Sequence, residues 1–441
     1  MIMKKNLAQG PITKTMLLFA GPMILGNLLQ QCYNIADTLI VGRVLGADAL
    51  AAVGSAYTLM TFLTSIIIGL CMGSGAVFSV HFGKRDYGQM KNRMVIAFLF
   101  IASVTVLMNV AVFAGIHSIL RLMQVPEEIF DLMADYVWVI FFGIFYIFLY
   151  NYFAYLLRAV GNSVIPLVFL GISTALNIAM DVWLVMFLHL GVKGAAFATV
   201  LSQAFSGIGI GIYTWLFEKD LRPDKQILFL KRQAVMEVIR NSFAACIQQS
   251  VMNFGILMIQ GLVNSFGTVV MAAFAAAVKI DSFAYMPAQE FGNAFSLFIS
   301  QNHGAGKKER VKQGMKEAVK VSVLFCMFVS TVIFVLAPQL MKIFIDGNEL
   351  QIIGTGVQYL RIEGAFYCGI GLLFLLYGFY RGVEKPEMSL ILTVISLGTR
   401  VLLAYTLAPI PAIGVLGIWW AIPIGWFLAD ITGIICIRKA L

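Results

Sequence analysis

Charged residues are scarce in this sequence. Of 441 residues, 12% are charged and 60% are hydrophobic, whereas about 25% of an ordinary soluble domain is charged. This scarcity excludes a soluble protein, because so many apolar side chains could not be kept from water. The apolar residues also form long runs, and about 20 in a row span a bilayer as a helix. The sequence therefore predicts an all-α polytopic membrane protein.

The sequence also lacks the residue patterns of several kinds of site. Its six cysteines lie singly in apolar segments and its four histidines are dispersed, so neither a metal set nor a redox pair is visible. There is no ATP-binding Gly-x-x-x-x-Gly-Lys-Ser/Thr motif and no adjacent nucleophile and base. We expect no cofactor, no ATP and no enzymatic activity, and a membrane-embedded enzyme is the less favoured alternative.

The net charge of +9 does not indicate a nucleic-acid partner. Binding to nucleic acid requires basic residues gathered on one soluble surface, but here the lysines and arginines lie in short links between apolar blocks. Such cations instead set the orientation of a membrane protein. We therefore expect the lipid bilayer as a partner and no nucleic acid.

Twelve apolar blocks predict twelve transmembrane helices. Lys4 and Lys5 precede a first block that is too long for a signal peptide and lacks a cleavage site, so this block is expected to stay in the protein. Block boundaries are uncertain by several residues. The blocks lie at about 14–42, 48–81, 94–119, 130–157, 164–188, 194–217, 235–264, 269–301, 317–344, 351–380, 388–408 and 415–437.

The distribution of cations predicts the topology. With twelve spans, most lysines and arginines outside the blocks fall on one side of the membrane. The exceptions are Arg43, Arg121, Lys193 and Lys342. Since positive links stay in the cytoplasm, we expect both termini there, in a multi-pass protein of the plasma (inner) membrane.

The two halves of the chain resemble each other. Gly83-Lys84-Arg85 returns as Gly304-Ala305-Gly306 after 221 positions, and Gly191-Val-Lys-Gly194 returns as Gly414-Val-Leu-Gly417 after 223. An offset of six helices gives both copies the same orientation, related by an axis along the membrane normal. We expect an N-terminal six-helix lobe over 1–218, a cytoplasmic linker over 219–233 and a C-terminal six-helix lobe over 234–441.

An acidic residue stands inside the first apolar block. Gln30, Asn34 and Asp37 are spaced i, i+4 and i+7, so a helix places all three on one face. An aspartate near the bilayer centre costs roughly 2.5–3.5 kcal/mol on insertion scales, and function is its default explanation. A role in holding helices together is the alternative.

Several ordered patterns resemble the multidrug and toxic compound extrusion (MATE) transporters. They are Gly21-Pro22 followed by Gln31-x-Tyr33-Asn34-x-x-Asp37, the paired basic links, Arg158-Ala-Val-Gly161-Asn162 and Asn177-x-x-x-Asp181. The resemblance covers nearly the whole chain. It implies a V-shaped pair of lobes that export organic, often cationic, drugs or toxic compounds by alternating access in exchange for H⁺ or Na⁺.

The resemblance also implies site residues. Prokaryotic members hold the coupling ion within the N-terminal lobe, and polar positions of the same lobe and a proline that bends the first helix have matches here. A static kink is the alternative for the proline. The implied coupling-ion residues are Asp37, Asn177, Asp181 and Thr199, the less secure polar matches are Tyr136 and Asn151, and the hinge is Pro22.

The chemistry of these residues supports that assignment independently. Asn177 and Asp181 are four apart and share a helix face. Two carboxylates in one low-dielectric pocket cannot both stay ionised cheaply, so at least one is expected to hold a proton near neutral pH. The same oxygens, with an amide carbonyl and the Thr199 hydroxyl, also suit Na⁺. H⁺ and Na⁺ are both candidates for the coupling ion, and no other metal is expected.

The second half does not duplicate this site. Met258 corresponds to Asp37 and Arg400 to Asn177 at the repeat offsets. Some relatives carry a glutamate within the block corresponding to 235–264, where this chain offers Gln248, Gln249, Asn253 and Gln260. Asp281 and Glu290 with Glu363 and Arg361 are candidates for a structural polar network, for which Lys279 and the two arginines, Arg361 and Arg400, supply cations.

The substrate is the least determined feature. The chain has 22 Met and 35 Phe, whose flexible thioethers and aromatic faces suit varied organic cations. We expect small organic substrates and a monomeric exporter, with a flippase for lipid-linked cargo or an exporter of one metabolite as alternatives. Candidate cavity residues are Met252, Met258, Phe283, Met286 and Glu290.

Overall fold

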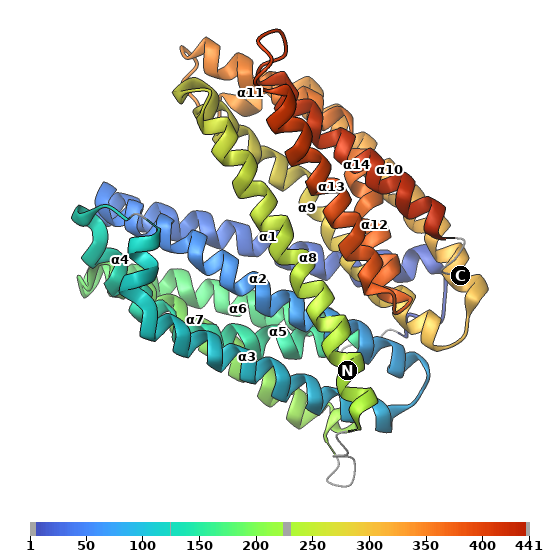
Figure 1. Ribbon diagram of the computed structural model, residues 1–441. Helices are drawn as coiled ribbons and strands as arrows, with labels where there is room; N and C mark the ends of the chain where they lie inside the picture. Colours follow the sequence, from blue (N-terminus) through green and yellow to red (C-terminus); the bar gives the residue numbers. More distant parts are fainter. Residues whose placement is uncertain (1–5, 124, 224–230, 438–441) are drawn as a thin grey trace. The chain divides into compact units, whose positions relative to one another are not determined.

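The described chain is helical throughout. The structure is a computed structural model and describes residues 6–123, 125–223 and 231–437, among which there is no β-strand. Figure 1 shows the helices in chain order. They are α1 (Ile12–Leu45), α2 (Ala47–Gly83), α3 (Tyr87–Leu122), α4 (Glu127–Ile140), α5 (Gly143–Ala159), α6 (Val164–Asp181), α7 (Gly191–Phe217), α8 (Arg232–Asn264), α9 (Thr268–Gly304), α10 (Lys308–Met341), α11 (Leu350–Ala365), α12 (Tyr367–Gly382), α13 (Pro386–Leu407) and α14 (Leu416–Ile437), with a π-helical segment η1 (Val182–Phe187) and a 3₁₀ turn η2 (Lys219–Leu221).

The helices are long and apolar enough for a polytopic membrane protein. Within the described residues, ten can cross a membrane, and two bent pairs raise the number to twelve if each pair is one span. The pairs are α4 with α5, bent by 43°, and α11 with α12, bent by 52°. The predicted all-α polytopic fold is confirmed. Apolar runs did not reveal the two bends, because both arms of a bent helix stay apolar.

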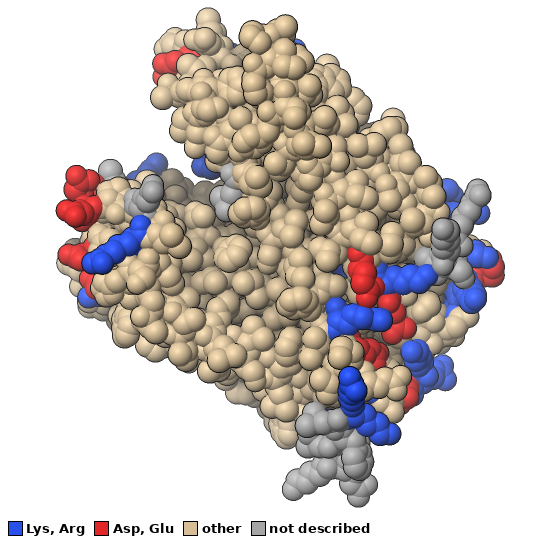
Figure 2. Space-filling model, viewed as in Figure 1, with Lys and Arg blue, Asp and Glu red and all other residues tan. Residues whose placement is uncertain are grey.

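On the face drawn in Figure 2, charged side chains gather at the ends of the molecule. Figure 2 shows blue and red residues at the ends of helices and broad uncharged sides between them. The side faces carry large exposed apolar residues such as Leu107, Phe187 and Phe328. An exposed apolar belt of this kind is compatible with lipid and not with water.

The chain forms two compact units, and each combines separate stretches of the sequence. Unit 1 contains Gly21–Cys246, and unit 2 contains Leu7–Ala20 together with the chain from Ile247 onward. Helix α1 therefore passes from unit 2 to unit 1 between Ala20 and Gly21, one residue before Pro22. Helix α8 passes from unit 1 to unit 2 after Cys246. Each of these two helices belongs partly to both units.

The start of the described chain is fastened within unit 2. The Leu7 amide donates to Gln301 Oε1 at 3.0 Å, and Asn302 Nδ2 donates to the Leu7 carbonyl at 3.2 Å. Lys307 Nζ donates to the Ala8 carbonyl at 2.7 Å, and Arg310 reaches the carbonyls of Leu7, Gln9 and Gly10. The segment before α1 is thus held by side chains at and after the end of α9.

The backbone repeats at the same offsets as the sequence. Four positions of positive φ in unit 1 have counterparts in unit 2, separated by 221 or 223 residues. Two of the eight are not glycine, which shows that the repeat preserves the turn even where the residue changed. The pairs are Gly46 with Gly267, Arg85 with Gly306, Gly161 with Glu384 and Gly191 with Gly414.

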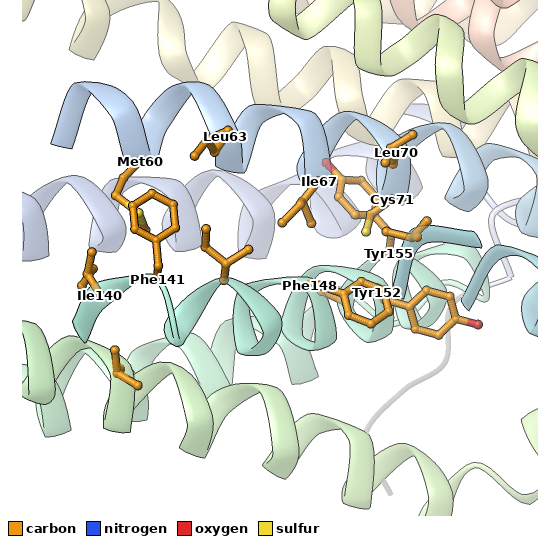
Figure 3. Packing of buried hydrophobic residues seen from close by; sticks show 14 of the residues in the cluster. Met60, Leu63, Ile67, Leu70, Cys71, Ile140, Phe141, Phe148, Tyr152 and Tyr155 are labelled. Carbon is orange, nitrogen blue, oxygen red and sulfur yellow. The ribbon is translucent and has the colours of Figure 1, made fainter. Parts of the chain in front are cut away.

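The core of unit 1 lies between α2 and the bent pair α4 and α5. Figure 3 shows Met60, Ile67 and Cys71 of α2 facing Phe141 and Phe148 across this contact. The ring of Phe148 lies 6.0 Å from that of Tyr152, whose hydroxyl donates to the Met94 carbonyl of α3 at 2.7 Å. In lipid, such close packing and buried hydrogen bonds drive helix association. This core fixes the helices that carry the polar site.

Candidate functional site

Polar side chains from four helices of unit 1 meet in its interior. Helix α1 supplies Asp37, α4 supplies Tyr136, α6 supplies Asp181 and α7 supplies Thr199. Asp181 is fully buried, Thr199 and Tyr136 are almost so, and Asp37 is half-buried. The side chains come from distant parts of the sequence, so the fold brings them together.

The two aspartates form a pair. The carboxyl groups of Asp37 and Asp181 are close enough to act electrostatically on each other. In the described chain, no lysine or arginine acts electrostatically on either group. Two carboxylates without a counter-cation repel each other strongly in a low-dielectric interior. The pair therefore needs a proton or a cation to be stable.

Tyr33, Thr199 and Asn177 form a hydrogen-bonded group beside the pair. The Tyr33 hydroxyl is 3.1 Å from Thr199 Oγ1, and Asn177 Nδ2 donates to the same Oγ1 at 3.3 Å. Asn177 is buried and presents its amide nitrogen to Thr199, so its carbonyl oxygen is free for another partner. These hydrogen bonds link α1, α6 and α7 next to the aspartates.

Several oxygen atoms at the site have no protein partner. Both carboxylate oxygens of Asp181, Asp37 Oδ1 and Asn177 Oδ1 are buried without a hydrogen bond among the described residues. A buried acceptor without a partner is costly and requires an explanation. Carboxylate and amide oxygens are the ligands that hard cations prefer, and a proton shared by the carboxyl groups relieves the same cost. The residues present fit either H⁺ or Na⁺.

The backbone changes its helical form at Asp181. Helix α6 ends at this residue, and the π-helical segment η1 follows directly. Single π turns within helices often occur at functional sites, since the wider turn changes the direction of neighbouring side chains. Here the wider turn begins beside the buried carboxylate. The sequence contained no visible signal for it.

Tyr136 and Tyr33 flank the aspartates. Tyr136 lies within electrostatic range of Asp37, Asp181 and Tyr33. Tyr33 was part of the recognised pattern, but the sequence analysis did not include it among the site residues. Its position one helical turn before Asp37 was an available signal, because residues i and i+4 share a face.

Two of the predicted supporting residues bond to other groups, and a third is exposed. Asn34 Nδ2 donates to the Tyr57 hydroxyl of α2 at 3.2 Å, and Gln30 is exposed. Asn151 Nδ2 donates to the Ile147 carbonyl of its own helix at 2.9 Å. Neither of these hydrogen bonds reaches the aspartate pair.

Pro22 lies within α1, next to the boundary between the two units. A proline inside a helix removes one backbone hydrogen bond and favours a bend. The neighbouring Gly21 has open space around its Cα, with no atom within 4 Å of an added Cβ. The hinge at Pro22 stays a prediction.

The candidate cavity residues belong to unit 2 and have different surroundings. Met252 and Met258 on α8 and Glu290 on α9 are half-buried, Met286 is buried and Phe283 is exposed. Glu290 accepts from Asn293 at 3.3 Å. Their role toward a substrate stays a prediction.

Together these features define a polytopic α-helical membrane protein with an interior pair of acids, one buried and one half-buried, that lacks a counter-cation. The chain belongs to the MatE family, whose pattern matches residues 22–183 and 242–406. Members of this family are transporters. The resemblance to MATE proteins noted from the sequence is thus confirmed.

Individual relatives agree with the family assignment. The chain is 30% identical to the probable multidrug resistance protein YpnP of Bacillus subtilis over 89% of this chain and 87% of that protein. It is 26% identical to the probable multidrug resistance protein NorM of Thermotoga maritima, covering 92% and 88%. The solved structure of a MOP superfamily transporter from Pyrococcus furiosus matches with a TM-score of 0.91 at 25% identity, covering 98% and 96%.

Proposed function

We propose that this protein is a multidrug exporter that moves small organic compounds, many of them cationic, out of the cell in exchange for H⁺ or Na⁺. Both relatives described above are named as probable multidrug resistance proteins. The observation that supports ion coupling is the Asp37 and Asp181 pair, which is buried beside unpartnered oxygens and without a counter-cation. The protein acts as a transporter and not as an enzyme.

The aspartate pair couples the ion to export because its stability differs between the form without an ion and the form that holds one. When both carboxyl groups are ionised, their mutual repulsion and burial make the site unstable. Loading with a proton or Na⁺ removes that cost, and Thr199 and Asn177 orient the oxygens that share the charge. An ion can drive a conformational change only through such a difference in affinity between two states. Loss of the pair is therefore expected to uncouple export from the gradient.

Helix α1 can transmit the change from the site. It carries Asp37 in unit 1, while its first part, Ile12–Ala20, belongs to unit 2. Pro22 leaves the carbonyl four residues earlier without its helical partner, which softens the helix at this point. Pro22→Ala is expected to slow turnover with little change in ion affinity. Unchanged turnover would favour a static kink.

The protein is placed in the plasma (inner) membrane with both termini in the cytoplasm. The cation-rich links support this orientation through the positive-inside rule. A monomer suffices, since unit 1 contains the complete candidate site. No ATP, nucleic acid or further cofactor is required, because the ion gradient supplies the energy.

Ethidium efflux from proteoliposomes tests the proposal. Purified wild-type protein is given a proton gradient or a sodium gradient separately, and efflux identifies the ion that drives export. Asp37→Asn and Asp181→Asn are expected to abolish gradient-driven efflux. Asp135→Asn is the matched control, because this aspartate pairs with Lys193 at 3.1 Å with both side chains half exposed. Efflux that persists in Asp37→Asn would exclude the site, and absence of ethidium efflux in correctly folded wild type would favour a narrow substrate.

A further inference from the structure

The beginning of α10, in unit 2, carries a lysine at every fourth position. These residues are Lys308, Lys312, Lys316 and Lys320, and all four are exposed. Residues four apart are neighbours on one side of an α-helix, so the lysines form a row that turns slowly around α10. The apolar part of the helix begins directly after Lys320, at Val321. The row therefore lies where a membrane-spanning helix leaves the bilayer.

Two acidic residues offset part of this charge. Lys312 Nζ lies 3.0 Å from Glu309 Oε1, and Lys320 Nζ lies 2.8 Å from Glu317 Oε1. Both lysines remain exposed, and exposed ion pairs of this kind are weak. Lys316, between them, forms no ion pair with a described residue. Because each ammonium group has three donors, Lys316 and Lys320 can both bind a further anion.

The face of α10 that carries these two lysines becomes apolar further along the helix. Leu324 and Met327 follow Lys316 and Lys320 at spacings of four and three, which keep all four residues on one face. Leu324 and Met327 are 69% and 57% exposed. Side chains on a helix tilt toward its first residue, so the ammonium groups point away from the apolar part. This face therefore presents positive charge followed by apolar surface, which complements the headgroup and acyl chains of an anionic phospholipid.

The corresponding helix of unit 1 lacks the positive charge. At the repeat offset of 221, Lys316 corresponds to Val95 of α3 and Lys320 to Leu99. Leu99 is exposed and Val95 is half-buried, so the apolar face of α3 continues two turns closer to the start of its helix. Since α3 folds without these lysines, the repeated architecture does not require them. The two lysines of α10 are a feature of unit 2 alone.

The neighbouring cations of unit 2 have other surroundings. Lys307 and Arg310 donate to backbone carbonyls of the segment before α1. Lys308 precedes Lys320 by twelve residues, which is about 18 Å along the helix and about a third of a turn around it. Lys308 therefore lies outside the face that Lys316 and Lys320 share with the apolar residues.

We propose that Lys316, Lys320, Leu324 and Met327 form a binding site for one anionic phospholipid. The two ammonium groups bind phosphodiester oxygens of the headgroup, and an acyl chain lies along the apolar face. Clusters of about four to eight basic residues at the end of a spanning helix are typical of anionic lipid recognition. In the proposed orientation the lipid belongs to the cytoplasmic leaflet. The inference adds a lipid partner to the proposed exporter and does not depend on which ion drives it.

Photo-cross-linking at position 327 identifies the lipid on this face. A benzophenone amino acid replaces Met327, and the protein is reconstituted in liposomes with equal amounts of phosphatidylglycerol and phosphatidylcholine. Irradiation joins the probe to a neighbouring acyl chain, and the mass of the adduct identifies the headgroup. We expect phosphatidylglycerol adducts to exceed phosphatidylcholine adducts about fivefold or more, because one lysine near the surface favours an anionic lipid by about that factor.

Three matched variants test where this enrichment arises. Lys316→Gln with Lys320→Gln is expected to remove it. Lys308→Gln removes a charge from the same helix outside the site and should leave the enrichment unchanged. The same probe in place of Val106, the counterpart of Met327 in α3, should show no enrichment. Equal enrichment with and without the two lysines, or equal enrichment at both probe positions, would overturn the proposal.

Free phosphate is the other source of the same anionic chemistry. Inorganic phosphate is added to one sample and sodium chloride of equal ionic strength to another. We expect the same small decrease in enrichment in both, because screening depends on ionic strength. Loss of the enrichment in phosphate alone would show that the lysines bind the free anion and would overturn the lipid assignment. Cross-linking requires no efflux, so a negative result leaves the proposed export activity unaffected.

Discussion

The hydroxyl group of Tyr33 on α1 lies 3.1 Å from Thr199 Oγ1 on α7. Thr199 also accepts from Asn177 Nδ2 of α6 at 3.3 Å, so one threonine joins three helices beside the Asp37 and Asp181 pair. The Thr199 hydroxyl is small and neutral, so it can orient the side chains around the candidate ion without adding charge.

Thr199→Val should weaken ion binding and leave the fold intact. Valine has nearly the same shape but cannot hydrogen-bond, and each bond lost costs about 1 kcal/mol. We expect the half-saturating concentration of the coupling ion to rise roughly fivefold to tenfold. Ion-dependent efflux in proteoliposomes measures this. Thr214→Val on the same helix is the control, because its hydroxyl bonds only to the Ile210 carbonyl. An equal effect in both variants would contradict the role of Thr199.

Gly73→Ala should destabilise the packing of α2 against α8. A Cβ on Gly73 would lie 2.3 Å from the Asn241 carbonyl oxygen, and one on Gly69 would lie 2.6 Å from Cys246 Cα. Because both obstacles are backbone, the helices must move apart, at a cost of about 1–3 kcal/mol. Gly54→Ala on the same helix meets no atom within 4 Å and should be neutral or stabilising. Thermal unfolding in detergent measures both, and equal melting temperatures would contradict this account.

Glu237→Gln should loosen the first part of α8 from α2 and α3. Glu237 Oε1 lies 3.0 Å from His81 Nε2, and Oε2 accepts from Arg93 Nε and Nη2 at 3.0 and 2.9 Å. Both partners are nearly buried, so loss of the carboxylate leaves their polar groups without a charged acceptor. We expect this to lower the free energy of unfolding by about 1.5–3 kcal/mol.

The control for this change is Glu309→Gln. Glu309 forms an exposed pair with Lys312 at 3.0 Å, and exposed pairs contribute about 0–1 kcal/mol. Hydrogen exchange of α8 should increase in Glu237→Gln and not in the control. Unchanged exchange in both variants would show that the contact does not hold α8.

Arg85→Gly should stabilise the protein slightly. Arg85 adopts a φ of 59° where its repeat counterpart, Gly306, adopts 70°. Left-handed backbone costs a side-chain-bearing residue about 1–2 kcal/mol, which exceeds the entropy cost of glycine. We expect a gain of about 0.5–1 kcal/mol in unfolding free energy. Lys84→Gly, at a φ of −65°, should lose stability instead. The same sign for both changes would contradict the argument.

The membrane fold was predictable because a spanning helix must be apolar for most of its length. That requirement does not specify the direction of the helix axis, so the bends after Ile140 and at Phe366 could not be seen in the apolar runs. Asp37, Asn177 and Asp181 were visible as polar residues at helical spacing. Their meeting with Thr199 and Tyr33 depends on the packing of α1, α6 and α7.

Charge pairing in unit 2 shows the same limit. Asp281 and Glu363 were recognised as network candidates, and Lys279, Arg361 and Arg400 were all expected to supply positive charge. In the structure Lys279 and Arg361 are exposed, whereas Arg400 of α13 acts electrostatically on both acids. Sequence proximity on one helix did not indicate which cation faces inward, because that depends on the neighbouring helices.

The most direct test of ion coupling measures the ion itself. An ethidium gradient is imposed on proteoliposomes without any ion gradient, and movement of H⁺ and Na⁺ in the opposite direction is recorded. We predict that ethidium drives one of these ions across the membrane in wild type and in Asp135→Asn, but not in Asp37→Asn or Asp181→Asn. Ethidium transport by wild type with neither ion moving would contradict the account.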